Sequence, residues 1–186
     1  MPANETLGAI TSRRSTRAYK PDPIPEDILS DILKAGQAAP YVAPDSRRFS
    51  VLRDRRLITR LSEAAKEQGI KLGDFQREMF SAPGFDGTYG APVVVILSGN
   101  PETVQYEAVC AASVQNMLIA AQSLGVASCW AYFPVFAFHG TDAEAWRTEL
   151  RIPQEYRPCA AVLLGYAAAE PYAQAGERYR NAVDYV

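Results

Sequence analysis

The sequence predicts a single α+β domain in which helices surround a small sheet. Three observations support this prediction. Helix and strand signals are mixed along residues 1–186, and no linker, low-complexity run or internal repeat divides them. The chain is 48% hydrophobic and 22% charged, which is typical of a globular protein with a core. Its length suits one domain rather than two, so we expect one domain over 1–186.

The first predicted helix lies within "PEDILSDILKAGQAAP". It begins at Pro25 with two acidic residues, which favour a helix N-terminus. Ile28, Ile32 and Leu33 recur at helical spacing, and the pattern stops before Pro40. These features predict an amphipathic helix.

Two strands and a second helix are predicted next. "RFSVLRD" alternates apolar and polar residues as a strand does, and Asp54 is placed to cap a helix that ends at Gly69. "APVVVILSG" is a short β-branched run beside a proline, which predicts a buried strand.

The stretch 101–125 predicts a long buried helix. It is apolar on nearly every face, rich in small residues, and ends at Gly125. Polar residues interrupt it too often for a segment that spans a bilayer; they are Gln105, Glu107, Gln115, Asn116 and Gln122. We therefore expect no membrane association through this segment.

The last predicted elements are two more buried strands, "VASCWAYF" and "CAAVLLGY", with a short helix between them at "DAEAWRTEL". The tail "GERYRNAVDYV" is too polar to form core by itself.

The charge and cysteine content exclude several classes of function. The net charge is −2 and the pI is about 5.5, so the chain has no overall basic field for a nucleic acid or an anionic membrane. The start "MPANETLGAI" has no secretory pattern, which predicts a cytoplasmic protein. Cys110, Cys129 and Cys159 are odd in number and far apart in sequence, which favours reduced core thiols over disulfides. With His139 as the single histidine, we predict no metal site.

The segment "SRRSTRAY" concentrates positive charge near the start of the chain. In an extended segment alternate side chains share a face, so Arg13, Ser15 and Arg17 would converge while Arg14 points away. Guanidinium groups and a hydroxyl are donors that suit a phosphate. The alternative is a solvated basic end of a helix, where arginines complement the helix C-terminus. From this segment alone the two interpretations remain open.

Six segments in sequence order resemble the nitroreductase family of FMN-dependent oxidoreductases. They are "RRSTRAY", "AAP", "YGAPVVVIL", "QNMLIAAQSLGVASCW", "LRIPQEYRPCAAVLLGY" and the terminal basic pair in "RYR". The resemblance covers nearly the whole chain. It implies an α+β fold with a central mixed or antiparallel sheet flanked by helices. It also implies an intertwined homodimer with two FMN sites at the subunit interface.

The resemblance implies three groups of cofactor-binding residues. The phosphate and ribityl group of FMN would be bound by the first segment and the tail: Arg13, Arg14, Ser15, Arg17, Arg178 and Arg180. A loop from the other protomer would supply Pro40, Tyr41, Val42 and Asp45. The turn at Trp130, Ala131, Tyr132 and Phe133 would lie against the flavin edge and offer a backbone N–H to N5. The long helix through Gln115 and Asn116 would form much of the dimer interface.

The sequence departs from the family pattern in two loops. "APYVAPDSRRF" replaces a Ser-rich loop, and Pro44 or Asp45 stands near an expected Asn. A buried Asp45 beside a reduced flavin would be unfavourable unless Arg47 or Arg48 pairs with it. The bulky "AYF" replaces a turn that usually contains glycine in the family, which predicts a narrower or differently shaped pocket.

Aromatic residues around this turn are candidates to stack on a planar acceptor; they are Tyr41, Tyr132, Phe133, Phe136 and Phe138. Runs of this kind more often form core. His139 follows the run. It could contact a substrate, but a histidine in such a position more often has a structural or surface role. Trp130 is expected to pack in the core beneath the turn.

The function implied by the resemblance is electron transfer from NADH or NADPH, through bound FMN, to a small planar acceptor in a ping-pong cycle. The flavin supplies the redox chemistry, so no catalytic side chain is required. No GxGxxG turn is present, which is consistent with a nicotinamide that binds only transiently. The alternatives are a specialised relative that dehalogenates or breaks down a flavin, and a non-catalytic flavin-binding or storage protein. A nucleic-acid module is disfavoured by the acidic pI.

Overall fold

The computed structural model describes residues 4–169 and 183–186. The center of the fold is a four-stranded antiparallel sheet in the order β1-β2-β4-β3. The strands span β1 Arg47–Leu52, β2 Val93–Gly99, β3 Ala127–Ala131 and β4 Arg157–Gly165. The α+β prediction is confirmed. β1 and β3 form opposite edges of the sheet, and this separation determines where the candidate site residues lie.

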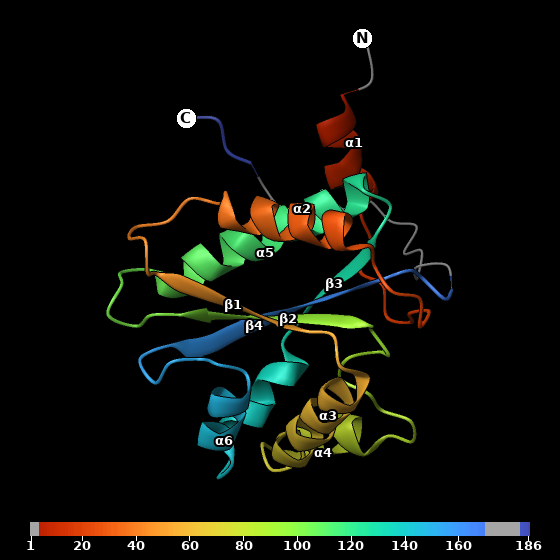
Figure 1. The fold of residues 1–186 in the computed structure, drawn as a ribbon, viewed down its shortest axis with the longest axis vertical. Coiled ribbons are helices and arrows are strands. Elements are labelled where there is room, and N and C mark those ends of the chain that lie inside the picture. The colour runs from red at the N-terminus through yellow and green to blue at the C-terminus, as the bar shows by residue number, and fades with distance from the viewer. Residues whose placement is uncertain (1–3, 170–182) are drawn as a thin grey trace.

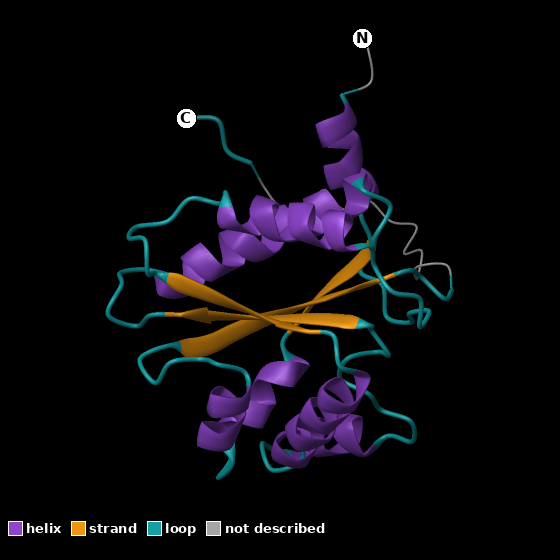
Figure 2. Ribbon diagram, viewed as in Figure 1, coloured by secondary structure: helices purple, strands orange, loops and turns teal. Residues whose placement is uncertain are grey.

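Helices cover both faces of the sheet (Figures 1 and 2). One layer holds α2 (Glu26–Gln37) and α5 (Tyr106–Ser123). The other layer holds α3 (Arg55–Gly69), α4 (Asp74–Ser81), the 3-10 helix η1 (Phe133–His139) and α6 (Ala143–Glu149). The first helix, α1 (Glu5–Ser12), projects from the body of the molecule (Figure 1).

The alternation of side chains along β2 divides the core in two. Val93, Val95 and Leu97 pack in the layer with α2 and α5, whereas Val94 and Ile96 pack against the opposite layer. All residues of β2 are buried, as the continuous apolar run predicts for a strand covered on both faces.

Most of the helices predicted from the sequence are present, but the predicted long helix begins later than expected. Asp54 caps α3 as predicted, because its Oδ1 accepts a 2.8 Å hydrogen bond from the Leu57 N–H. Gly125 follows α5 with a φ of 71°, and the next residue, Val126, donates back to Ala121 O at 2.8 Å. The predicted long helix begins only at Tyr106, because Gln105 is left-handed with a φ of 59°.

Three elements, α1, α4 and η1, form where no sequence pattern predicted them. α5 is also less buried than its apolar sequence predicted. The residues that pack on the sheet and on α2 are buried, but Glu107, Ala108 and Gln115 are exposed, and Asn116 is half-buried. One side of α5 is therefore left uncovered by residues 4–169 and 183–186.

Candidate functional site

The arginine-rich segment is extended and tied to the edge of the sheet. Thr16 N–H donates to Ser128 O at 3.0 Å, and Ser15 forms an isolated bridge with Ser128 at the beginning of β3. Further along, Lys20 N–H donates to Tyr166 O at 2.8 Å. These bonds give the segment the alternation of a strand, which fixes which side chains face together.

Arg13, Ser15 and Arg17, which we call the arginine–serine site, lie around one sulfur atom. Burial raises the pKa of the Cys129 thiol, while the charge of Arg17, a hydrogen bond from Ser15 and the charge of Arg13 all oppose that rise. The three side chains therefore converge, as the alternation predicts. Two positive charges and a hydroxyl in one place are a suitable set of donors for a phosphate.

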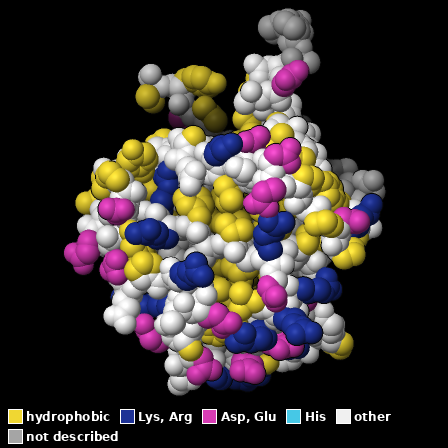
Figure 3. Space-filling model, viewed as in Figure 1, with side chains coloured by type: hydrophobic (Ala, Val, Ile, Leu, Met, Phe, Trp, Pro, Cys, Tyr) yellow, Lys and Arg dark blue, Asp and Glu magenta, His cyan; other side chains and the backbone are white. Residues whose placement is uncertain are grey.

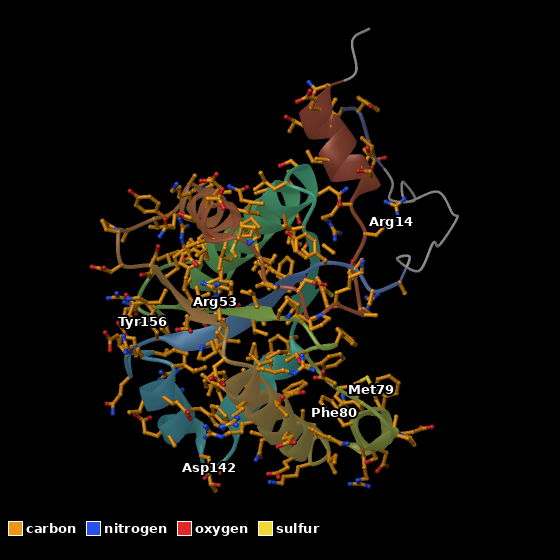
Figure 4. All side chains as sticks on the ribbon, turned by 45° about the vertical axis from the view of Figure 1, so that its right-hand side comes forward. Arg14, Arg53, Met79, Phe80, Asp142 and Tyr156 are labelled. Atoms are coloured by element: carbon orange, nitrogen blue, oxygen red, sulfur yellow. The ribbon has the colours of Figure 1, made fainter. Side chains whose placement is uncertain are left out.

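Arg14 faces elsewhere. Its Nη1 donates to the carbonyl oxygens of Thr11, Ser12 and Arg13, at 2.9, 2.9 and 3.0 Å. These carbonyls lie at the C-terminal end of α1, at whose base Arg14 is seen in Figure 4. For this one arginine, the structure matches the alternative interpretation of a side chain that complements a helix C-terminus.

Tyr89 is a neighbor of Arg17 that was not among the candidate residues predicted from the sequence. Its side chain hydrogen bonds with Arg17, and its backbone is left-handed, with a φ of 54°. Such a backbone is uncommon for tyrosine and costs on the order of 1–3 kcal/mol, so it persists only where the surroundings impose it. The only sequence signal is its place in "TYGAP", between a threonine and a glycine.

The Tyr89 backbone is held by a network around Asp86. Asp86 Oδ1 accepts hydrogen bonds from Ser62 Oγ at 2.7 Å and from Thr88 N–H at 2.8 Å, and Oδ2 accepts from Gly90 N–H at 2.8 Å. Burial would raise the pKa of Asp86, but the hydrogen bonds from Thr88, Ser62 and Gly90 outweigh it and hold the pKa below its ordinary value. An ionised carboxylate thus fixes the loop that places Tyr89 beside Arg17.

The end of β3 and the residue that follows it present two aromatic rings to the surface. Trp130 is 44% exposed and Tyr132 is 48% exposed, whereas Ala131 between them is buried. The expectation that Trp130 packs in the core is wrong. Strand alternation turns Cys129 and Ala131 toward the layer of α3 and η1 and places Trp130 on the opposite face of the sheet. Because β3 is an edge strand, the Trp130 ring there is only partly covered.

Phe133 differs from Tyr132 in direction. Its ring packs edge-on against Phe80 and Phe85, both at 5.4 Å between ring centroids, and lies 6.4 Å from Tyr89. The Phe133 ring therefore anchors η1 in an aromatic cluster. Of the two bulky side chains in "AYF", Tyr132 is the one whose ring is exposed, so any narrowing of the pocket depends on Tyr132 and not on Phe133.

A hollow of about 440 Å³ lies beside the exposed rings of Trp130 and Tyr132. Trp130 and Tyr132 form one wall, α5 contributes another, and the beginning of β4 forms a third. The residues from α5 and β4 include Tyr106, Glu107, Cys110, Arg157 and Cys159. The hollow thus combines aromatic surface with one acidic and one basic residue.

The loop at 40–45 lies at the other edge of the sheet, because it leads into β1 while the arginine–serine site adjoins β3. Tyr41 and Val42 are exposed, and hydrophobic side chains reach the surface over this loop in Figure 3. Pro40 is exposed as well. One protomer therefore does not bring Pro40, Tyr41 and Val42 next to the arginine–serine site.

Arg47 holds the start of this loop through hydrogen bonds to backbone carbonyl groups. Its guanidinium donates to the carbonyl oxygens of Gln37, Ala39 and Pro40, at 2.6, 2.9 and 3.1 Å, and lies 5.5 Å from the centroid of the Tyr41 ring. Asp45 is exposed, so its carboxylate does not need the buried ion pair considered above. Arg48 instead lies over the Tyr156 ring, at 5.3 Å.

The remaining candidates add little to the site. Arg178 and Arg180 lie outside the described residues. His139 is exposed and contacts the Phe136 ring edge-on at 5.5 Å. Over 4–169 and 183–186, the His, Cys, Asp and Glu side chains form no group of three or more that could hold a metal ion. No helix in that same part of the chain is long and apolar enough to cross a membrane.

The fold and the segment at the sheet edge place this protein among the α+β proteins that share the nitroreductase architecture. The model of the nitroreductase family matches residues 10–166. The chain belongs to the nitroreductase family.

Three relatives illustrate the similarity. A Bacteroides fragilis nitroreductase crystallised with bound FMN superposes with a TM-score of 0.91, at 31% identity, over 99% of this chain and 100% of that one. A Desulfitobacterium hafniense nitroreductase, also with bound FMN, gives a TM-score of 0.87 at 25% identity over 99% of both chains. A Methanothermobacter thermautotrophicus protein, named provisionally as an NADH dehydrogenase/NAD(P)H nitroreductase, is 28% identical over 90% of this chain and 80% of its own length.

Proposed function

We propose that this protein is an FMN-dependent oxidoreductase that takes electrons from NADH or NADPH and passes them to small planar acceptors, such as nitroaromatics or quinones, in a ping-pong cycle. The observation that carries the proposal is the convergence of Arg13, Ser15 and Arg17 at the edge of the sheet. Family membership and the FMN bound by two similar nitroreductases support it.

The arginine–serine site fits the phosphate end of FMN. A terminal phosphomonoester carries nearly two negative charges and three acceptor oxygens, and Arg13, Ser15 and Arg17 supply matching charge and donors. Tyr89 keeps the Arg17 side chain in place. We further propose that Arg178 and Arg180 join this site and that the turn at 130–133 lies along the edge of the ring system.

When bound, FMN supplies reversible two-electron chemistry at its ring system. The protein binds the cofactor, orients it and excludes water. Arg13 and Arg17 would also favour an anionic reduced cofactor, because positive charge stabilises a developing negative charge. Trp130 and Tyr132 offer flat apolar surface on which a planar acceptor can stack.

We also propose that the working unit is a homodimer. The loop at 40–45 and the arginine–serine site adjoin opposite edges of the sheet, so a second chain is needed to bring the two together. α5 offers an uncovered side for that contact. Alanine and polar residues on this side would be buried when two chains associate.

The proposal is tested with the purified protein. We expect a yellow protein that releases FMN on denaturation, sediments as a dimer, and loses its flavin absorbance when NADH or NADPH is added without oxygen. Addition of a quinone should then restore the absorbance, with parallel lines in double-reciprocal plots. A bound flavin that neither nicotinamide reduces would favour a flavin-binding or storage protein. A protein that neither contains nor takes up FMN would contradict the proposal as a whole.

The size of the acceptor should depend on Tyr132. We expect Tyr132→Ala to raise kcat/KM for bulky quinones by roughly 10-fold relative to small ones, because removal of the ring enlarges the hollow; pocket-size effects of this kind are worth about 1–3 kcal/mol. Tyr132→Phe is the matched control, since it keeps the ring and should keep the preference. Steady-state kinetics over a quinone series of increasing size measures both. An equal change for small and large acceptors would show that Tyr132 does not limit size.

A further inference from the structure

Two cysteines from distant parts of the chain meet in the wall of the hollow. Cys110 lies on α5 and is fully buried, while Cys159 lies near the beginning of β4 and is half-buried. Both line the hollow beside Trp130 and Tyr132. The two thiols are hydrogen-bond partners of each other. Cys110 and Cys159 are far apart in the sequence, but the fold brings their thiols together.

An irregularity in the sheet directs Cys159 toward Cys110. The pairing of β2 with β4 shifts between Leu97 and Ser98: Leu97 is opposite Ala160, and Ser98 is opposite Pro158. Cys159 is thus the extra residue of a β-bulge, a feature that re-aims a side chain. In a regular strand, Cys159 and Ala160 would face opposite layers, yet both pack in the layer of α2 and α5.

The other thiol is held in place by close packing. A Cβ atom added to Gly99 would lie 3.2 Å from Cys110 Sγ, so the sulfur lies directly against the Gly99 backbone. Gly99 also donates its backbone N–H to the Cys159 sulfur. The end of β2 therefore contacts both sulfurs and keeps them together.

We propose that Cys110 and Cys159 are a redox-active pair that a peroxide converts into an intramolecular disulfide. In the first step the Cys159 thiolate attacks one oxygen of the peroxide, the O–O bond breaks, and a sulfenic acid and hydroxide, or an alkoxide, are formed. In the second step the Cys110 sulfur displaces the hydroxyl group of that sulfenic acid, the S–S bond forms, and water leaves with the Cys110 proton. The two sulfurs are oxidised and the peroxide is reduced.

The two thiols differ in a way that assigns their roles. The pKa of Cys159 lies below its ordinary value, because Cys110 donates a hydrogen bond to it and Gly99 N–H adds another, against the effect of burial. The pKa of Cys110 is raised by the same hydrogen bond and by burial. The thiolate is the reactive form, so Cys159 attacks and Cys110 resolves. When Cys159 is protonated, its thiol donates a hydrogen bond to Arg157 O, at 3.1 Å.

This inference does not depend on the proposed flavin chemistry, because it needs only the two thiols and a peroxide. The disulfide would join α5 to β4 in the wall of the hollow, beside Trp130 and Tyr132. Cys129 lies elsewhere, at the arginine–serine site, and serves as an internal control.

The test uses the full-length protein treated with hydrogen peroxide, then quenched, denatured and alkylated before mass spectrometry. We expect the oxidised protein to lose two hydrogens and to retain one alkylatable thiol of the three in the sequence, Cys129. Chymotrypsin cuts between Cys110 and Cys129, for example after Leu118, and should release one peptide pair that links Cys110 to Cys159.

Single alanine variants separate the roles of the three cysteines. Cys129→Ala should form the disulfide as the wild type does, whereas Cys110→Ala should stop at a Cys159 sulfenic acid that dimedone traps. Should Cys110→Ala fail to fold, the wild-type peptide map still decides the question. The proposal is overturned if the disulfide contains Cys129 or links two chains. It is also overturned if all three thiols remain alkylatable after methionines of the same protein have been oxidised.

Discussion

The double substitution Arg13→Ala with Arg17→Ala is expected to weaken FMN binding by roughly 100- to 10,000-fold while the fold remains intact. Each charge-assisted hydrogen bond contributes about 1.5–3 kcal/mol, so loss of one from each arginine removes about 3–6 kcal/mol. Each single variant should lose roughly 10- to 100-fold. Titration of the apoprotein with FMN, followed by quenching of flavin fluorescence, gives the affinities.

Arg77→Ala is the matched control for the lost charge. Arg77 is an exposed arginine on α4 that pairs with Asp74 at 2.8 Å, on a helix that belongs to the opposite layer from α5. It should leave the affinity unchanged. Tyr89→Phe should produce a smaller loss than Arg17→Ala, because it frees the Arg17 side chain without removing it. A double variant that binds FMN as tightly as the wild type would refute the arginine–serine site.

The second large effect is expected for stability. Phe80→Ala should lower the free energy of unfolding by about 3–5 kcal/mol, as is usual for a large aromatic residue in a core. Phe80 is fully buried, and its ring centroid lies 4.8, 5.4 and 5.5 Å from those of Phe85, Phe133 and Phe136. Figure 4 shows it between α3 and α4. Urea denaturation followed by circular dichroism measures the change.

The same helix provides the control for this prediction. Phe75 is 74% exposed on α4, so Phe75→Ala should change the free energy of unfolding by no more than about 0.5 kcal/mol. The Phe80 ring also supports Phe133 at the start of η1, and the variant should therefore loosen the turn at 131–133. Equal costs for the two substitutions would mean that the aromatic cluster does not hold α4 and η1 in place.

Local sequence patterns were sufficient for most of the secondary structure. The spacing of Ile28 and Ile32, the Asp54 cap and the apolar run of β2 each depend on neighbours within a few residues, so they can be recognised without the fold. The same holds for the arginine–serine site. Alternation along an extended segment places Arg13, Ser15 and Arg17 on one face wherever that segment lies.

Contacts between distant segments decided the rest of the candidate site. No local pattern indicates that β3 is an edge strand, so the sequence alone places Trp130 in the core although it is exposed. The direction of the Phe133 ring depends on Phe80 and Phe85, which belong to other elements. Tyr89 gains its place beside Arg17 only because the network around Asp86 holds its backbone left-handed.

The sequence by itself determined which side chains share a face, because the periods of helices and strands are properties of the local backbone. The tertiary structure alone decided which faces are covered and which distant groups meet. The clearest case is Cys159, whose neighbour on α5 depends on a bulge in the pairing of β2 with β4. A bulge arises from the register between two strands, and register is set by long-range pairing that no single segment of the chain encodes.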